Sequence, residues 1–420
     1  MQRLLGFSMA VLVGACGAKV DSGTAKPPLS GGSSGGASSS GGASAADAGQ
    51  REEGVPAPTA GSGGVPAGSG GAPAGTGGAF FGSDGSGPGS EGVAGTPSVD
   101  ASTPSCAHIS TKPGQFNPCG RTTGIDYSPD GTLLAVATQT DQPNLHLFDL
   151  RTGALVRDMA GIDQGLYDVA FSPDGKLLAV GGLAGGGFLS EGTNLAKLYD
   201  VATGAEVRAL PTSCGSYVSG VGFSNDGTLL ATSGYQGPVE IWRVSDGVRV
   251  TSIDYPTTAY NVHFAPVGSA IVVGGMDGRV TVYDVPSGKL TLTLSPTINE
   301  MSDPRFSPDG TQLATAGPDN SIQFWDRSTG HLRQSVPTHS VYVSRLLWLD
   351  QDHVVSNDWS GAIDWMTRDP SGSFVNSAQW MTGGQSLGLA ISPDRKTLAA
   401  GTGEGTVEGF EFFAIDASKL

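Results

Sequence analysis

Positive charge is scarce in this sequence. Its 420 residues include 23 Lys and Arg against 39 Asp and Glu, so the formal net charge at pH 7 is −16. A chain with this acidic excess is poorly suited to bind nucleic acid or an anionic membrane through its own surface, because both are negatively charged. Long apolar runs are also absent: none reaches the roughly 18 residues of a membrane-spanning helix, which excludes a polytopic membrane protein.

Cysteine is rare, and one of the four cysteines lies where a secretory signal would end. Arg3 precedes a mostly apolar run over residues 4–15, which is too short to span a bilayer and has the length of a signal-peptide core. The run ends in Val13-Gly14-Ala15-Cys16. Small residues before a cysteine resemble the bacterial lipobox, with Val13 in the place where leucine is usual.

The lipobox resemblance implies that residues 1–15 are a lipoprotein signal peptide and that the mature chain begins at an acylated Cys16. The acyl chains attached to this cysteine would outnumber the two membrane-binding signals that stable anchoring needs. We therefore expect a lipid-anchored protein at the outer membrane of a bacterial cell envelope. The sequence leaves open whether the protein is on the periplasmic side or on the cell surface. An ordinary cleaved signal followed by a chance cysteine is the alternative.

Residues 17–105 have few apolar side chains and are dominated by Gly, Ser, Ala, Pro and Thr. Such a segment cannot bury enough apolar surface to offset the entropy of ordering it. We expect residues 16–105 to be a lipidated, disordered tether, which looks like the Gly/Ser tracts of some Gram-negative surface lipoproteins. The part of the chain that can fold is therefore 106–420.

One phrase recurs through residues 106–420: an apolar pair followed by Ser-Pro-Asp-Gly, which we name the turn motif. It occurs at 128–131, 172–175 and 307–310, and weaker copies begin at Ser224, Ala265, Leu349 and Ser392. Successive copies begin 41 to 52 residues apart. A glycine, usually after Ser or Thr, keeps the same register at positions 153, 204, 247, 288, 330 and 372. The turn motif and this glycine recur in step along the chain, and the seven copies of the motif indicate seven structural repeats.

The residue types of the turn motif are those that a type I turn favours, and the second glycine predicts another hairpin. Short segments rich in Val, Leu, Phe and Tyr lie between these turns, and in the second repeat they are 167–171, 177–180, 196–199 and 207–210. Each repeat is therefore predicted to form four antiparallel strands, the size of one propeller blade. The fold class is all-β: a seven-bladed β-propeller of four-stranded antiparallel blades.

The predicted third strands end in Phe148-Asp149, Tyr199-Asp200, Trp242-Arg243, Tyr283-Asp284 and Trp325-Asp326. These pairs resemble the Trp-Asp mark of the WD-repeat propeller family across residues 106–420. The resemblance implies a polar set within a blade, and only the sixth repeat approaches it, with His339, Ser356, Asp358 and Trp365. The last repeat lacks a fourth strand, so we expect residues 107–111 to complete it and to close the ring.

Residue patterns that carry chemistry are missing. No two of the six histidines have metal-ligand spacing, and the Gly-x-Ser-x-Gly match at 31–35 lies in the tether, away from any strand–turn–helix. We therefore expect no catalytic residue, no metal and no cofactor. Among the cysteines we pair Cys106 with Cys119, which flank the expected closing strand; Cys119 with Cys214, or three free thiols, are the alternatives.

The second repeat carries nine extra residues between its second and third strands, which include Phe188, Leu189 and Glu191. In the resembled family such loops share a face with the links between blades. Those links, and one further loop of the same kind, present aromatic residues: Tyr167, Tyr217, Tyr260, Tyr342 and Trp359. Tyr and Trp anchor protein interfaces, so we interpret this face as a protein-binding surface. In the other interpretation, each Tyr packs at the mouth of the ring.

The sequence thus favours a non-catalytic, monomeric, lipid-anchored envelope protein that uses its propeller as a scaffold for an envelope or extracellular protein or peptide. The alternative is a propeller enzyme, or a carbohydrate or small-ligand binder, that uses the central channel. That function needs converging carboxylates or histidines on the inner strands, where we expect only His263.

We predict that Cys16 carries the lipid. Mass spectrometry of the mature protein should find an acylated Cys16 at its N-terminus, and Cys16→Ser should release the protein from membranes. An intact Met1, or an unmodified N-terminus downstream of Cys16, would contradict the assignment.

Overall fold

The computed structural model describes residues 108–109, 115–117, 121–139, 143–162, 164–183, 195–294, 303–316, 320–405 and 409–415. The chain divides into two units, Met1–Val93 and Ala94–Leu420, and all described residues belong to the second. Every regular element in this part of the chain is a β-strand. None of these residues forms a helix long and apolar enough to cross a membrane.

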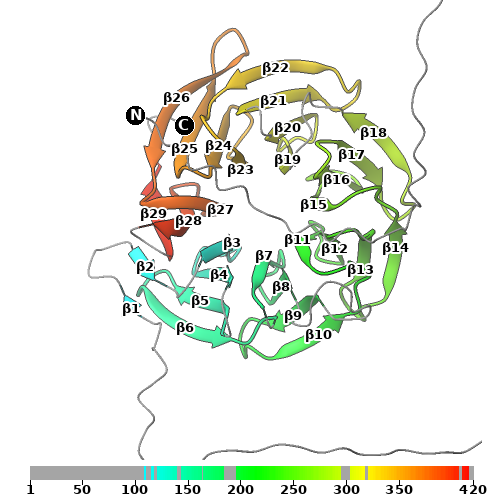
Figure 1. Cartoon of the computed structure of the whole chain (residues 1–420), viewed down its shortest axis with the longest axis vertical. Coiled ribbons are helices and arrows are strands. Elements are labelled where there is room, and N and C mark those ends of the chain that lie inside the picture. Colours follow the sequence, from blue (N-terminus) through cyan, green and yellow to red (C-terminus); the bar gives the residue numbers. More distant parts are fainter. Residues whose placement is uncertain are drawn as a thin grey trace, which may run out of the picture. The chain divides into compact units, whose positions relative to one another are not determined.

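The strands form seven antiparallel sheets that stand around a ring, each running from its centre to its rim (Figure 1). Blade 1 comprises β3 (Arg121–Tyr127), β4 (Leu133–Gln139), β5 (Leu145–Asp149) and β6 (Ala154–Met159). Blade 2 comprises β7 (Leu166–Phe171), β8 (Leu177–Gly182), β9 (Ala196–Asp200) and β10 (Glu206–Leu210). Blade 3 comprises β11 (Val218–Phe223), β12 (Leu229–Gly234), β13 (Val239–Arg243) and β14 (Arg249–Ile253). Blade 4 comprises β15 (Ala259–Phe264), β16 (Ala270–Gly275), β17 (Val280–Asp284) and β18 (Leu290–Leu294).

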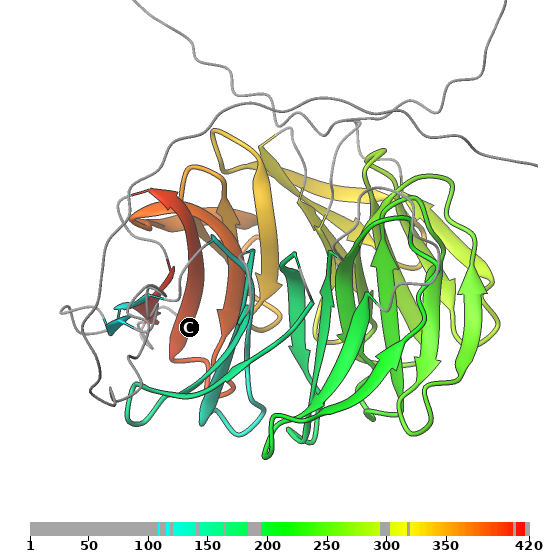
Figure 2. The ribbon, with the colours of Figure 1, turned by 60° about the horizontal axis from the view of Figure 1, so that its bottom comes forward.

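Blade 5 comprises β19 (Asp303–Phe306), β20 (Gln312–Ala316), β21 (Ser321–Asp326) and β22 (Leu332–Pro337). Blade 6 comprises β23 (Val343–Trp348), β24 (His353–Asp358), β25 (Ala362–Arg368) and β26 (Phe374–Met381). Blade 7 comprises β27 (Gly384–Ile391), β28 (Thr397–Gly405) and β29 (Gly409–Ala414), together with β1 (His108–Ile109) and β2 (Gln115–Asn117). The predicted seven-bladed propeller is confirmed, and Figure 2 shows the strands running between the two faces of the ring.

The turn motif folds as its residue types predict. In blade 1 the Ser128 hydroxyl donates to Asp130 Oδ1 at 2.6 Å and accepts the Leu133 N–H at 2.9 Å. The Gly131 N–H donates to the Ser128 carbonyl at 2.8 Å, and Gly131 has a φ of 71°, which favours glycine. The motif thus fixes the turn between the first two strands of a blade through the hydrogen bonds of its own side chains.

Successive turn motifs also contact each other around the ring. A Cβ built on Gly175 of blade 2 would lie 3.5 Å from Pro129 of blade 1. A Cβ on Gly131 would lie 3.5 Å from Pro393 of blade 7, although the two residues are far apart in the sequence. The proline of one blade therefore covers the glycine of the next, and the contact between blades 7 and 1 continues the series.

The apolar core lies between blades rather than within them. Each of the seven core clusters draws its buried side chains from two neighbouring blades. Blades 7 and 1 meet where Phe148 and Phe410 pack edge to face, with ring centroids 5.3 Å apart. Inner strands are covered on both faces, whereas the rim strand β6 alternates, with Val156 47% exposed.

The closing strand differs from the sequence prediction, which assigned it to residues 107–111. β29 pairs with β2, through Phe116 and Phe410, and β1 adds outside β2 as a fifth strand. The physical reason is chain connection: the segment that pairs with β29 must lead directly into β3, and β2 is the nearer of the two strands to Arg121. The N-terminal segment does close the ring, but with a later stretch than expected.

We predict that Phe116→Pro lowers the unfolding free energy by about 2 kcal/mol or more, because proline cannot donate in a strand that is paired on both sides. Val99→Pro, upstream of the first described residue, is the control. Thermal unfolding followed by circular dichroism should show a lower Tm for Phe116→Pro alone. Equal melting temperatures for both variants and the wild type would contradict closure by β2.

Candidate functional site

A cavity of about 220 Å³ lies at the centre of the ring and contacts the inner strands of all seven blades. Because side chains alternate along a strand, positions two and four residues before the turn motif face this cavity or its margin. Six of these positions carry charged or titratable side chains: Asp126, Asp168, His263, Asp303, Arg305 and Arg345. We name these six residues the channel cluster.

The three carboxylates of the channel cluster each hold the next blade. One oxygen of each accepts a backbone N–H from the neighbouring inner strand. The pairs are Asp126 with Phe171 at 2.8 Å, Asp168 with Val221 at 3.1 Å, and Asp303 with Leu346 at 2.8 Å. These contacts give the carboxylates a structural role and fix where their remaining oxygens lie.

Asp303, His263 and Arg305 form a compact group on blades 4 and 5. His263 Nε2 lies 3.2 Å from Asp303 Oδ1, and Arg305 Nη1 lies 3.1 Å from His263 Nδ1. Arginine can only donate, so Nδ1 accepts and Nε2 carries the hydrogen that Asp303 accepts. Burial and the charge of Arg305 lower the pKa of His263 to about 4, so the ring is neutral at pH 7. Burial raises the pKa of Asp303, but Arg305 and His263 outweigh it and hold the pKa below its usual range.

Arg345 reaches from blade 6 across the centre of the ring. Its Nη1 donates to Asn261 Oδ1 of blade 4 at 2.7 Å, and its Nη2 lies 3.5 Å from Asp168 Oδ1 of blade 2. Its Nε donates to the Leu387 carbonyl of blade 7 at 3.3 Å. The side chain of Arg345 therefore links four blades and is buried among them.

Asp126 has no comparable cation. Among the residues that the structure describes, no Lys, Arg or His nitrogen forms an ion pair with its carboxylate. Burial, together with the nearby charge of Asp168, raises the pKa of Asp126 to about 7. Burial also raises the pKa of Asp168, although Arg345 opposes it. Each arginine of the channel cluster is thus paired with an aspartate, Arg345 with Asp168 and Arg305 with Asp303 at 3.5 Å each, whereas Asp126 has no paired cation among the described residues.

The expectation that the inner strands carry only His263 is wrong. In the sequence, each carboxylate or arginine of the channel cluster looks like an ordinary polar residue of a short strand, and Asp303 and Arg305 share one strand. The signal that could have found these residues is their position in the sequence, either two or four residues before the turn motif. Because the repeats place equivalent positions on the same ring, that distance brings distant residues together.

The predicted aromatic residues lie at the upper face, which we define as the face where the inner strands begin. Tyr167 stacks on Tyr217 with ring centroids 4.8 Å apart, and Tyr217 lies 5.3 Å from Tyr235. Tyr342 and Trp359 form a second pair at 5.6 Å on blade 6. Tyr235 follows the second strand of blade 3 as Trp359 does in blade 6, and the sequence analysis missed it.

The aromatic side chains at the upper face are half-buried, so both sequence interpretations keep a basis in the structure. Tyr260 lies near Tyr167 and Tyr217, and burial raises its pKa. The nine-residue insertion begins next to them, because the backbone of Leu183 forms a bridge with Tyr217. Phe188, Leu189 and Glu191 lie outside the described residues.

Three of the four cysteines, Cys16, Cys106 and Cys119, also lie outside the described residues. Cys214 is a buried free thiol in the core between blades 2 and 3, and burial raises its pKa to about 12. The free thiol of Cys214 does not support the alternative pairing of Cys119 with Cys214. Within the described part of the chain, no group of three His, Cys, Asp or Glu side chains is arranged to hold a metal ion.

Comparison with known proteins agrees with this geometry. Residues 153–186 and 288–326 match the family described as "WD domain, G-beta repeat". "Telomerase protein component 1" of Mus musculus is 27% identical over 309 residues, which are 72% of this chain and 11% of that protein. Human "WD repeat-containing protein 3" is 29% identical over 196 residues, 44% of this chain and 20% of that protein.

A chain in the "Crystal Structure of Mitotic Checkpoint Complex" is 20% identical, with a TM-score of 0.60 over 69% of this chain and 86% of that chain. This likeness shows the fold. The chain spans about a tenth of the length of the telomerase components of Mus musculus and Rattus norvegicus. The comparisons therefore show the propeller fold and a match to the WD-repeat model in two segments.

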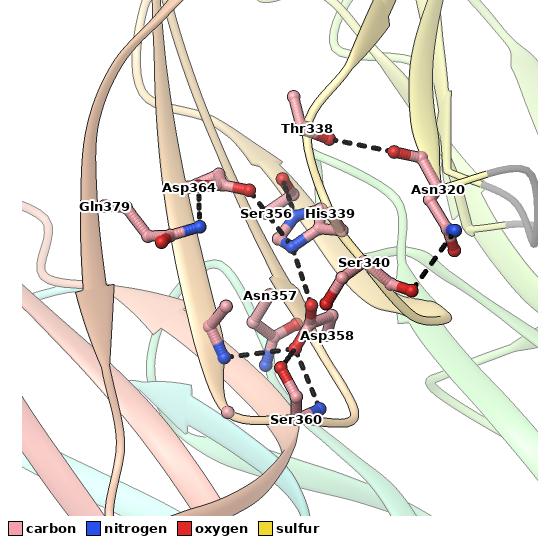
Figure 3. A network of polar contacts seen from close by, with 12 residues as sticks. Asn320, Thr338, His339, Ser340, Ser356, Asn357, Asp358, Ser360, Asp364 and Gln379 are labelled. Atoms are coloured by element: carbon pink, nitrogen blue, oxygen red, sulfur yellow. Dashed lines mark hydrogen bonds and ion pairs between the residues drawn. The ribbon is translucent and has the colours of Figure 1, made fainter.

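Blade 6 of the propeller contains most of the polar set that the resemblance to WD repeats implies (Figure 3). The buried His339 lies with Nε2 2.8 Å from Ser356 Oγ and Nδ1 3.1 Å from Asp358 Oδ2. Trp365 Nε1 has no hydrogen-bond partner among the described residues, whereas Asp364 Oδ2 lies 3.1 Å from His339 Nδ1. The set thus lacks the tryptophan hydrogen bond that the family pattern implies, and a second carboxylate, that of Asp364, lies beside His339.

Blades 3 and 5 contain the tryptophan hydrogen bond of that set, which blade 6 lacks. Trp242 Nε1 donates to Thr232 Oγ1, and Trp325 Nε1 donates to Thr315 Oγ1, each at 3.0 Å. Both indoles are buried, so these bonds satisfy donors that would otherwise be unpaired in the core.

We predict a pH-dependent effect of Asp126→Asn, which keeps an oxygen for the Phe171 N–H but removes the titration. A carboxyl whose pKa rises from 3.8 to about 7 on folding makes the wild type less stable as pH rises between those values. The unfolding free energy of the variant relative to wild type should therefore increase by about 2–3 kcal/mol from pH 5 to pH 8.5.

Urea unfolding at several pH values measures this difference. Asp174→Asn, in the exposed turn motif of blade 2, is the control that leaves the channel unchanged. A constant difference between Asp126→Asn and wild type across the pH range would contradict the burial of an unpaired carboxyl.

Proposed function

We propose that this WD-repeat propeller is a non-catalytic scaffold whose upper face binds a protein or peptide. The single observation that carries the proposal is the aromatic stack of Tyr167, Tyr217 and Tyr235 across blades 2 and 3. Aromatic side chains supply large contact area at low entropic cost, and interface hot spots are enriched in them.

The surroundings of the stack support this use. Its side chains are half-buried, so the blades hold them in place while part of each ring reaches solvent. The strands beneath are buried on both faces, which makes the support rigid. The backbone of Leu183, where the insertion starts, forms a bridge with Tyr217, so the insertion leaves blade 2 beside the stack. The net charge of −16 favours a partner that is not nucleic acid.

We further propose that Cys16 anchors this scaffold by lipid in a bacterial envelope, which rests on the Val13-Gly14-Ala15-Cys16 sequence. Residues 16–105 would then hold the propeller away from the membrane as a tether. The partner would be an envelope or extracellular protein, and the scaffold would act as a monomer. Pairing of Cys106 with Cys119 is proposed with it, since the secretory route is oxidising.

The binding face can be tested in the full-length protein with a photo-crosslinking amino acid at Tyr217 or Tyr342. The matched control places it at Lys176, which is exposed in the turn motif of blade 2 on the lower face. A defined adduct from Tyr217 or Tyr342, identified by mass spectrometry, supports the proposal. Adducts formed only from Lys176 would assign binding to the other face.

We predict that Tyr217→Ala weakens binding of the crosslinked partner by about 2 kcal/mol, or roughly 30-fold in Kd, because it removes the centre of the aromatic stack. Lys176→Ala should leave Kd unchanged. Titration calorimetry with purified partner measures both. Equal affinities for Tyr217→Ala and wild type would remove this stack from the interface.

A further inference from the structure

We infer that the cleft between blades 3 and 4 receives a lysine side chain from an extended segment of a partner protein. The cleft has a volume of about 430 Å³ and lies at the outer rim of the ring. Its walls are the outer strand β14 with the link that follows it, and the facing side of β17 and β18. The cleft is separate from the upper-face aromatic stack, and the inference does not depend on the proposed partner of that stack.

The two preceding blades place a long polar side chain in the equivalent cleft. Two residues before the aromatic residue of the third strand, blade 2 carries Lys197, blade 3 carries Glu240 and blade 4 carries Thr281. Lys197 Nζ donates to the Gly161 carbonyl of the link from blade 1 at 3.2 Å. Glu240 accepts the Ser213 N–H of the link from blade 2 at 3.0 Å. Thr281 is too short to cross the cleft in this way, which leaves space in front of blade 4.

Three oxygen atoms in this cleft can accept hydrogen bonds. Thr281 Oγ1 is buried beside the Tyr255 hydroxyl and has no hydrogen bond of normal geometry to a described residue. The Tyr255 hydroxyl donates to the Arg279 carbonyl at 3.4 Å, so its oxygen can still accept. Asp254 is exposed, lines the cleft and forms no ion pair with a described residue. An ammonium group, which has three donors and no acceptor, suits these oxygens.

The charges around the cleft favour a cation. Arg279 does not make the cleft basic, because its Nε donates to Asp277 Oδ2 at 2.6 Å. The carboxylate of Asp254 is therefore the charge that lacks a described partner. The net charge of −16 attracts a basic partner at longer range.

The apolar walls and the size of the cleft suit the aliphatic stem of lysine. Ile253, Tyr283 and Leu290 line the cleft, and Leu290 is 49% exposed. Lysine buries its stem along such surface while its ammonium group reaches polar partners. A cavity of about 150 Å³ holds benzene, so about 430 Å³ has room for a lysine side chain and the peptide backbone beside it. Lys197, at the equivalent position of blade 2, shows that this fold accommodates an ammonium group there.

Three capped pentapeptides test the inference on the full-length protein. Each has the sequence acetyl-Ala-Val-X-Val-Ala-amide, in which X is lysine, norleucine or glutamate. We expect the lysine peptide to bind in titration calorimetry with a Kd below about 1 mM. Norleucine keeps the stem without the charge, so its peptide should bind about 10-fold more weakly. No binding of the lysine peptide at about 5 mM, or equally tight binding of either other peptide, would overturn the inference.

A variant that fills the cleft from within the chain locates the site. Thr281→Lys supplies the side chain that blade 2 has at this position, so it should fold, which circular dichroism checks, and it should weaken the lysine peptide about 10-fold. Val250→Lys is the matched control, because it adds the same charge to β14 at an exposed residue that does not line the cleft. Equal loss of binding in both variants would reduce the effect to charge repulsion and overturn the inference.

A second variant does not depend on packing in the cleft. Asp254→Asn removes an exposed carboxylate and should weaken the lysine peptide about threefold, whereas Asp174→Asn, which makes the same change of charge in the turn motif of blade 2, should not. Unchanged binding in both Asp254→Asn and Thr281→Lys, or loss of binding in Tyr217→Ala, would place the peptide elsewhere and overturn the inference. Dimers in sedimentation that the lysine peptide dissociates would assign the cleft to a second copy of this chain instead of a partner.

Discussion

Apolar packing between neighbouring blades is the interaction on which the rest of this structure depends. Each core cluster is shared by two blades, so no blade has a core of its own, and every sheet is stable only as part of the ring. The interface between blades 7 and 1 must form like the others, through Phe148 and Phe410, although the chain makes them the most distant pair. The outward additions of β2 and β1 protect the last edge of this ring.

The same closure crowds the inner strands together and creates the central cavity. A Cβ on Gly124 would lie 2.9 Å from the Asp168 Cα, so glycine is needed there for blade 1 to approach blade 2. Charged side chains occupy several of the other inward positions, and each carboxylate among them accepts a backbone N–H from the next blade. The inner polar residues therefore help to hold the blades in register as well as giving the cavity its charge pattern, and the rigid ring supports the aromatic stack above it.

Much of the fold was predictable from sequence because the turn motif makes its own hydrogen bonds. Ser128, Asp130 and Gly131 need no distant partner to form their turn, so a local pattern reported the strand boundaries correctly. The prediction of the closing strand was wrong because two short segments precede the first blade. Only the later one, β2, connects directly to β3 and pairs with β29. The prediction that Trp365 belongs to the polar set was also wrong. Its Nε1 has no hydrogen-bond partner among the described residues, and Asp364 lies beside His339.

The sequence by itself determined the number of repeats, the four-strand unit and, apart from Tyr235, the aromatic residues described at the upper face, because each depends on periodicity or on a turn that is local. Only the tertiary structure decided which inward residues meet. Asp126 and Arg305 are separated by more than half of the propeller sequence, and Arg345 contacts Asn261 and Asp168 across the ring. Strand periodicity gives the face of a side chain, but its neighbours across a closed ring depend on the number of blades and on their closure.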